Sequence, residues 1–210
     1  ITNYLWEAKL KDYPLVLPGL TIGLLGGSFD PPHEGHIHIS KTAIKIFNLS
    51  KLWWLVSPGN PIKDKTPSNI NNRLLASKRI MVHPSVIITD IEKKLKTKYT
   101  FQTLIKIKKM YPAARFVWIM GADNLINFHH WKNWDWIMKN IPIGVMARPR
   151  DQIKAGLSPA ATRFSKYRLP REKSLLLPYL SPPVWTLVTG SMKNISSTKL
   201  RVKGYWPGLI

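Results

Sequence analysis

The stretch from Thr21 to Phe47 constrains the fold of this chain more than any other part of it. It opens with a short apolar run, Thr21 to Leu25, that ends in the pair Gly26-Gly27. A run of this kind closed by glycines predicts a buried strand and then a turn where the backbone comes close to a ligand. The pair Pro31-Pro32 and the apolar periodicity after it predict the start of a helix. We therefore expect a strand, a glycine turn and a helix here.

The junction of this turn and helix is predicted to be a phosphate-binding site. Backbone N–H groups and the positive end of the helix dipole converge at a helix start and stabilise a bound anion. His33 and His36 would lie about 60° apart around a helix, so both can donate a ring N–H to one group. The residue order differs from both the P-loop and the dinucleotide fingerprint. A metal site that includes His38 is disfavoured, because His38 would face the other side and the chain has no cysteine.

Residues 26 to 36, Gly-Gly-Ser-Phe-Asp-Pro-Pro-His-Glu-Gly-His, resemble the G-G-S/T-F-D-P-x-H-x-G-H signature of the nucleotidylyltransferase superfamily. Later residues are similar to the nicotinate-nucleotide adenylyltransferases within it, and the resemblance covers about residues 22 to 203. It implies that His33 and His36 are catalytic and that ATP is bound by Gly26, Gly27, Ser28 and Phe29. The alternative, a glycine-rich turn with surface histidines, explains either half of the motif but not both in this order.

A second match lies near the other end of the chain. Residues 195 to 201, Ile-Ser-Ser-Thr-Lys-Leu-Arg, match the I-S-S-T-x-x-R signature of the same family. Hydroxyls stand there where a helix start has free N–H groups. The resemblance implies that Ile195, Ser196 and Ser197 bind ATP and that Arg201 is catalytic, holding the triphosphate together with Ser197. A plain Ser/Thr helix cap is the alternative, and it does not account for Arg201 at the matching spacing.

Two further segments are expected to contact ATP. The loop from Pro58 to Pro67 follows a predicted strand and is similar to the family's loop over ATP, so Lys63 is a candidate phosphate ligand; an ordinary surface lysine is an equal alternative. Gly121 and Asp123 follow the apolar run 115–120. Gly121 lets a ligand approach the strand end, and Asp123 can accept hydrogen bonds from hydroxyls or cap the next helix. In the family this position lies beside the nucleotide ribose.

The resemblance also places the nicotinate mononucleotide on Tyr99, Thr100 and Trp131. Thr100 is expected to be the N-cap of a helix that runs to about Met110, and the free N–H groups of that helix start suit a carboxylate. Trp131 and Trp134 would share a helical face, which more often indicates core packing. Because the first aromatic of this pair stacks on the pyridine ring in the family, we assign Trp131 to the ligand and Trp134 to the core.

Strands that alternate with helices predict an α/β fold with a single Rossmann-like, doubly wound, mostly parallel sheet and helices on both faces. We expect residues 1–20 to form an N-terminal extension and residues 21–210 to form the nucleotidylyltransferase domain. Residues 148–183 are rich in Pro, Arg and Ser and are expected to be irregular. The predicted strands are residues 21–25, 51–57, 86–91, 115–120, 143–147 and 184–188.

Composition limits the partners of the chain. A net charge of +21 suggests binding to nucleic acid or an anionic membrane, but no recognition motif accompanies the lysines, so we expect no specific nucleic acid partner. The uncharged apolar run from Pro14 to Phe29 is shorter than the roughly 20 residues that cross a bilayer and contains the phosphate motif. No membrane association and a cytoplasmic location are therefore expected. The sequence leaves the oligomeric state open, a homo-oligomer included.

The resemblance implies transfer of the adenylyl group of ATP to nicotinate mononucleotide, giving nicotinate adenine dinucleotide and pyrophosphate in NAD synthesis. The mononucleotide's phosphate is itself the nucleophile, so we expect direct in-line attack, with catalysis by positioning and charge stabilisation. Mg²⁺ is expected to be carried by the ATP phosphates, with no metal site of the protein's own. Nicotinamide mononucleotide and phosphopantetheine are alternative acceptors, and a basic nucleic-acid-binding module is a remote alternative.

Overall fold

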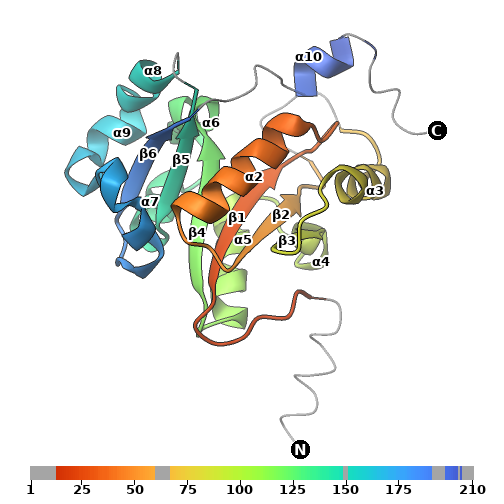
Figure 1. Ribbon diagram of the computed structural model, residues 1–210, viewed down its shortest axis with the longest axis horizontal. Helices are drawn as coiled ribbons and strands as arrows, with labels where there is room; N and C mark the ends of the chain where they lie inside the picture. Colours follow the sequence, from red (N-terminus) through yellow and green to blue (C-terminus); the bar gives the residue numbers. More distant parts are fainter. Residues whose placement is uncertain (1–12, 60–66, 149–150, 191–196, 203, 205–210) are drawn as a thin grey trace, which may run out of the picture.

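The computed structural model describes residues 13–59, 67–148, 151–190, 197–202 and 204, and the statements below concern these residues. They form a six-stranded sheet in which every neighbouring pair is parallel, with the strand order β3-β2-β1-β4-β5-β6 (Figure 1). All six predicted strands are present, with small shifts at their ends. Their bounds are β1 (Thr21–Gly27), β2 (Lys51–Val56), β3 (Val86–Thr89), β4 (Arg115–Gly121), β5 (Ile143–Ala147) and β6 (Trp185–Thr189).

Helices cover both faces of the sheet because both faces of its strands are apolar. Along β2, Trp53 and Leu55 pack into one core cluster, whereas Trp54 and Val56 pack into the other. The first cluster is completed by α5, α6, α7 and their neighbours, and the second by α2, by η3 and by residues along and just after α3. Strands buried on two sides in this way are typical of parallel sheets. The doubly wound, Rossmann-like fold predicted from the sequence is confirmed.

The helices follow the strands in the alternation that such a fold requires. Three of them, α2, α3 and α5, have eleven residues or more, and the others are short. Their bounds are α2 (Glu34–Ile46), α3 (Ile70–Ile80), α4 (Ile91–Lys94), α5 (Thr100–Met110), α6 (Ala122–Ile126), η1 (Phe128–His130), α7 (Trp134–Asn140), α8 (Gln152–Gly156), α9 (Pro159–Arg163), η2 (Ser165–Tyr167), η3 (Arg171–Tyr179) and α10 (Ser197–Val202).

The expectation of an irregular segment at residues 148–183 is wrong for the residues described there. Short helices α8, α9, η2 and η3 fill most of it. One reason is local capping: the Ser158 hydroxyl accepts the amide N–H of Ala161, and Pro159 occupies the first turn of α9, where its missing N–H costs nothing. Apolar residues of this segment such as Phe164 and Leu177 are buried against the sheet.

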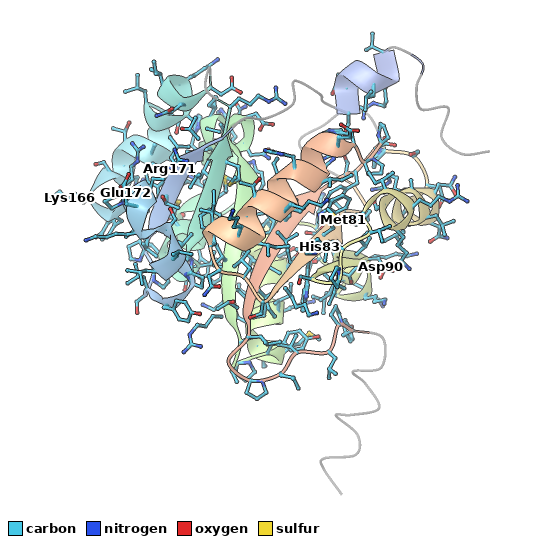
Figure 2. All side chains as sticks on the ribbon, in the orientation of Figure 1. Met81, His83, Asp90, Lys166, Arg171 and Glu172 are labelled. Carbon is cyan, nitrogen blue, oxygen red and sulfur yellow. The ribbon has the colours of Figure 1, made fainter. Side chains whose placement is uncertain are left out.

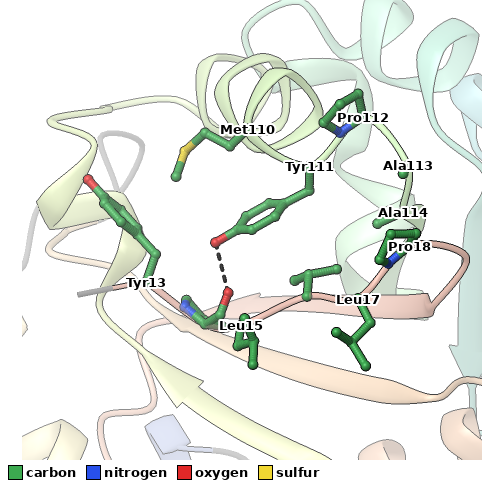
Figure 3. Close-up of a pocket in the computed structure, with 11 residues that line it drawn as sticks. Tyr13, Leu15, Leu17, Pro18, Met110, Tyr111, Pro112, Ala113 and Ala114 are labelled. Atoms are coloured by element: carbon green, nitrogen blue, oxygen red, sulfur yellow. Dashed lines mark hydrogen bonds between the residues drawn. The ribbon is translucent and has the colours of Figure 1, made fainter. Parts of the chain in front are cut away.

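Residues 13–20 pack onto the domain at the end of the sheet where the central strands β1 and β4 begin. The hydroxyl of Tyr111 donates to the carbonyl of Pro14 at 2.9 Å (Figure 3). The amide of Gly19 donates to the carbonyl of Ala113 at 2.8 Å. A small apolar hollow of about 210 Å³ lies between this segment and the end of α5. Among the described residues, no helix combines the length and apolar character needed to cross a membrane.

The strand order fixes where a ligand can bind. β1 is flanked by β2 on one side and by β4 on the other, so the connections leave β1 and β4 toward opposite halves of the sheet. A crevice opens at such a point outside the carboxyl ends of the strands. The glycine turn after β1 and the Gly121-Ala122-Asp123 segment after β4 both lie at this position.

Candidate active site

A single cleft of about 450 Å³ at the carboxyl ends of β1 and β4 brings together every predicted site residue that the structure describes. Lys63, Ile195 and Ser196 lie outside the described residues. The cleft is lined by segments that are far apart in the sequence, from the turn after β1 to α10. The predicted residues on its walls are Gly26, Gly27, Ser28, Phe29, His33, His36, Tyr99, Thr100, Gly121, Asp123, Trp131, Ser197 and Arg201.

His33 and His36 form the start of α2 together. His33 is the N-cap residue, and its Nδ1 accepts the amide N–H of Gly35 at 3.1 Å. The Nδ1 of His36 accepts the amide N–H of His33 at 3.2 Å. Because Nδ1 is an acceptor in both rings, a neutral imidazole must carry its proton on Nε2. Two Nε2–H donors, with ring centroids 3.8 Å apart, are therefore available at the helix start.

Burial keeps both histidines neutral. It lowers the pKa of His36 to about 3, with the charge of His33 as a smaller cause. It also lowers the pKa of His33 to about 4, where the positive charge of Arg148 adds to the effect. Neutral rings that donate through Nε2 bind a phosphate by hydrogen bonds, without the salt sensitivity of surface charges.

Phe29 supports His36 from a conformation that is rare for a bulky residue. Its φ is 47°, in the left-handed region. This turn places the ring, which is 1% exposed, in a stack on Trp54 with centroids 4.6 Å apart and beside His36 at 4.8 Å. Local strain held in place by packing is typical of a functional turn. Phe29 therefore lies beneath the histidines, and its side chain orients His36.

The two signature motifs meet in space, as expected from the resemblance. The Ser197 hydroxyl donates to the carbonyl of Pro31 at 2.8 Å, and Arg201 donates to the carbonyl of Asp30. A guanidinium nitrogen of Arg201 also lies 3.9 Å from the Asp30 carboxylate. These contacts dock α10 on the turn that precedes α2, so the hydroxyl of Ser197 and the guanidinium of Arg201 lie at the same cleft as His33 and His36.

At Gly26 the backbone passes close to a buried ring. A Cβ atom at this position would lie 2.6 Å from Cη2 of Trp118, a residue that is 2% exposed. We expect Gly26→Ala to lower the free energy of unfolding by about 1 to 3 kcal/mol, the usual cost of overpacking. Chemical denaturation measures this effect. Gly190→Ala is the matched control because no atom of the described residues lies within 4 Å of its Cβ position. Equal stability of the two variants would contradict the prediction.

The side of the cleft predicted to bind the mononucleotide begins at α5, and here the sequence prediction is wrong by one residue. The N-cap is Tyr99, and Thr100 is the first helical residue. Gln102 explains the shift, since its side-chain oxygen accepts the amides of Lys98 and Tyr99 at 3.2 Å. The amides of Gln102 and Thr103 donate to the carbonyl of Tyr99. The amides of Thr100 and Phe101 precede them and are the ones a helix start leaves for a ligand.

Trp131 and Trp134 do not share a helix, contrary to the sequence prediction. Trp131 is the C-cap residue of η1, and Asn133, which lies between the two tryptophans in the sequence, has the left-handed conformation, with φ 54°. Trp131 lines the cleft edge-on to Trp118, with centroids 6.3 Å apart. Trp134 instead packs edge-on against Phe164 at 5.9 Å. The assignment of Trp134 to the core agrees with this packing.

Asp123 faces the cleft and does not cap the helix after β4. The N-cap of α6 is Gly121, and no side chain caps this helix. A Cβ on Gly121 would lie 2.4 Å from Oδ1 of Asp123, so the exposed carboxylate bends back over the glycine. Of the two roles the sequence allowed, acceptance of hydrogen bonds from a ligand's hydroxyls is the one compatible with this geometry.

The structure adds residues to the cleft that sequence reasoning missed. Arg148 follows β5 directly, a place at the carboxyl edge of the sheet that could have marked it. Glu92 was hidden because the sequence prediction ended the third strand at residue 91, whereas α4 begins there. Burial raises the pKa of Glu92 to about 7, against a hydrogen bond from Thr103 that favours the charged form. The other additions include Lys98, Trp118, Lys132 and Asp151.

Glu92 and His36 make opposite contributions to the pH dependence of stability. The folded pKa of His36 lies below its ordinary value of 6.5, so its contribution is present above about pH 6.5 and is lost as the pH falls toward 3. The folded pKa of Glu92 lies above its ordinary value of 4.5, so its contribution is present below about pH 4.5 and is lost as the pH rises through 7.

We therefore expect the stabilities of His36→Asn and Glu92→Gln to shift in opposite directions relative to the parent. When the pH falls from 7 to 5, the free energy of unfolding of His36→Asn should rise by about 1 kcal/mol relative to that of the parent, after allowance for partial solvent access. The free energy of unfolding of Glu92→Gln should fall by about 1 kcal/mol relative to that of the parent. Urea unfolding at pH 5, 6 and 7 measures these differences. Parallel pH profiles of the three proteins would show that neither shift exists.

Fold and cleft together define a nucleotidyltransferase. A sequence model of the family described as cytidylyltransferase-like matches residues 24–203. Relatives named "Probable nicotinate-nucleotide adenylyltransferase" align over almost the whole chain. The relative from Ruegeria sp. (strain TM1040) is 53% identical over 90% of this chain and 100% of its own length. The relative from Ruegeria pomeroyi is 46% identical over 93% of this chain and 92% of its own. The chain belongs to the nicotinate-nucleotide adenylyltransferase family.

Solved structures support the fold. A Plasmodium falciparum nicotinic acid mononucleotide adenylyltransferase complexed with NaAD superimposes with a TM-score of 0.65, over 87% of this chain and 83% of that protein. The same enzyme complexed with APC gives a TM-score of 0.62 over the same shares. Both are 16% identical in sequence, so the likeness concerns the arrangement of the sheet and its helices.

Proposed function

We propose that this protein transfers the adenylyl group of ATP to nicotinate mononucleotide, giving nicotinate adenine dinucleotide and pyrophosphate. One observation carries the proposal: the phosphate turn with its two Nε2–H donors and the start of α5 with Trp131 open into the same cleft. A site with a polyphosphate half and an aromatic half suits two nucleotides that react through their phosphates.

The reaction needs no nucleophile from the protein. An oxygen of the mononucleotide's phosphate attacks the α-phosphorus of ATP, the bond from that phosphorus to the bridging oxygen breaks, and pyrophosphate leaves. His33 and His36 would donate Nε2–H bonds to the phosphate oxygens, where negative charge grows in the transition state. Arg201 and Ser197 would bind the triphosphate from α10, and Gly26 to Ser28 would let it approach the backbone.

Asp123 would accept hydrogen bonds from the ribose of ATP, and Gly121 would leave room for it. Lys63 would contact the phosphates from its loop. Mg²⁺ would enter with ATP as part of the substrate. Among the described residues there is no group of three or more His, Asp or Glu side chains that could hold a metal ion, so the phosphates and water would supply most of its ligands.

Pyrophosphate release measured with ATP, Mg²⁺ and each acceptor in turn tests the proposal. We expect rapid release with nicotinate mononucleotide, slower release with nicotinamide mononucleotide and none with phosphopantetheine. Turnover with phosphopantetheine alone would reassign the acceptor, and no turnover with any acceptor would refute the adenylyl-transfer function.

A further inference from the structure

Glu92 lines the cleft although it belongs to neither signature motif. It lies on α4, the short helix after β3, and its side chain is 9% exposed. Its neighbours on the cleft wall include Ser57, which follows β2, and the helix start at Tyr99 and Thr100. Burial of a carboxyl group is unfavourable unless specific hydrogen bonds compensate for it, so the partners of Glu92 indicate its role.

The hydrogen bonds of Glu92 lead to both ends of the turn that starts α5. Its backbone carbonyl accepts the amide of Thr97 at 3.0 Å and the hydroxyl of Thr97 at 3.3 Å. Its carboxylate accepts the hydroxyl of Thr103 at 3.5 Å, whereas the hydroxyl of Ser57 on the same wall donates to the carbonyl of Gly59 at 2.6 Å. The hydroxyls of Thr97 and Thr103 bond each other at 2.7 Å. Tyr99 and Thr100 lie in the middle of the segment that is held in this way.

The ATP side of the cleft has a separate anchor. Arg73, which is 1% exposed, donates to the carbonyl of Ser28 at 2.6 Å and to the carbonyl of Ser57 at 2.7 Å. The amide of Ser57 also donates to the carbonyl of Gly27 at 2.9 Å. The turn after β1 and the end of β2 are thus joined by bonds in which Glu92 takes no part.

From these two sets of contacts, and resting on the proposed function, we propose that Glu92 is a positioning residue for the acceptor mononucleotide. It joins α4 to the first turn of α5 through Thr97 and Thr103 and so fixes where the amides of Thr100 and Phe101 meet the cleft. Because Arg73 holds the ATP side independently, removal of the Glu92 side chain changes the affinity for the acceptor and leaves the affinity for ATP in place.

The experiment compares Glu92→Ala with Glu92→Gln. The Kd of nicotinate mononucleotide without ATP is measured by calorimetry, and kcat and the KM of ATP by pyrophosphate release. We expect Glu92→Ala to raise the Kd and KM of the mononucleotide about tenfold and to leave the KM of ATP within about twofold, as the loss of a positioning hydrogen bond predicts. Glu92→Gln should stay within about threefold of the parent, since its amide oxygen accepts the same hydroxyls.

Two further variants keep the test decisive. Asp90→Ala, at the residue labelled beside α4 in Figure 2, removes the 3.2 Å ion pair with Lys94 and should leave all constants unchanged. Thr103→Val removes the hydroxyl that donates to Glu92 and should raise the mononucleotide Kd in the same direction, even if Glu92→Ala does not fold. A parent that binds no nicotinate mononucleotide would overturn the proposed function, and this inference with it. If the parent binds the mononucleotide, three outcomes would overturn the role of Glu92 alone. The Kd of Glu92→Ala for the mononucleotide could equal that of the parent, or Glu92→Gln could lose as much affinity as Glu92→Ala. The third outcome is a rise in the KM of ATP in Glu92→Ala as large as the rise in the KM of the mononucleotide.

Discussion

Replacement of His36 by alanine is expected to lower kcat at least about a hundredfold. Its Nε2–H is one of two neutral donors at the start of α2, and the loss of one preorganised donor to a transition-state oxygen has this scale. The fold should survive, because α2 retains its other contacts, including the N-cap bond from the amide of Gly35 to His33. Steady-state kinetics with saturating ATP and nicotinate mononucleotide measure the effect, and circular dichroism checks the fold.

His38→Ala is the matched control for this prediction. His38 lies on the same helix, 3.5 Å from the hydroxyl of Thr42, and is not among the residues that line the cleft. Its kcat should equal that of the parent. If His36→Ala turned over like the parent, the catalytic role proposed for His36 would be wrong. If both variants lost activity equally, the loss would reflect a general effect on α2.

The second large effect concerns the choice between acid and amide acceptors. The N–H groups of Thr100 and Phe101 at the start of α5 suit the carboxylate of nicotinate better than the neutral amide of nicotinamide. A charge-assisted hydrogen bond contributes about 1.5 to 3 kcal/mol, so two such bonds give a preference of about a hundredfold or more in kcat/KM. The ratio of kcat/KM for the two mononucleotides measures it, and equal values would refute the assignment.

Three substitutions separate the contributions to this preference. Thr100→Pro removes one N–H at the first helical position, where proline is tolerated, and Tyr99 before it already has the extended conformation that proline requires, with φ −119° and ψ 145°. In this variant we expect the ratio of kcat/KM for the acid and amide mononucleotides to fall about tenfold. Thr100→Ala, which keeps the N–H, should retain the ratio of the parent. Trp131→Ala should weaken both acceptors alike, since an aromatic ring stacks on either pyridine. A changed ratio in Trp131→Ala would show that the ring discriminates between them.

The fold could be predicted from the sequence because each strand is an apolar run that ends in a turn residue or a charge. β1 ends at Gly27 and β4 at Gly121, and both ends were expected within two residues. The errors arose where one residue overrides a pattern. Thr100 is a better capping type than Tyr99, but Gln102 reaches back to two amides and moves the helix start. The spacing of Trp131 and Trp134 predicted that they share a helix, but the left-handed conformation of Asn133 interrupts the helix between them.

The candidate site could be predicted only where its residues are close together in the sequence. The turn with His33 and His36 and the segment of Ser197 and Arg201 could be recognised because their order is specific. Glu92 and Arg148 are single charged residues whose roles depend on the tertiary structure: Glu92 on the hydroxyls of Thr97 and Thr103, and Arg148 on its proximity to His33. Nothing in their local sequence separates them from the many charged residues of a chain with net charge +21.

The central place of β1 has a consequence for how the protein folds. β1 pairs with β2 soon after it, but its other neighbour is β4, and Thr21 lies opposite Arg115. Contacts between residues so distant in sequence form late, because the entropy of closing a long loop opposes them. The half built on β1 to β3 and the half built on β4 to β6 can therefore begin to condense separately. The seam where they join lies at the floor of the cleft, so we expect the cleft proposed to bind both nucleotides to form only when the two halves come together.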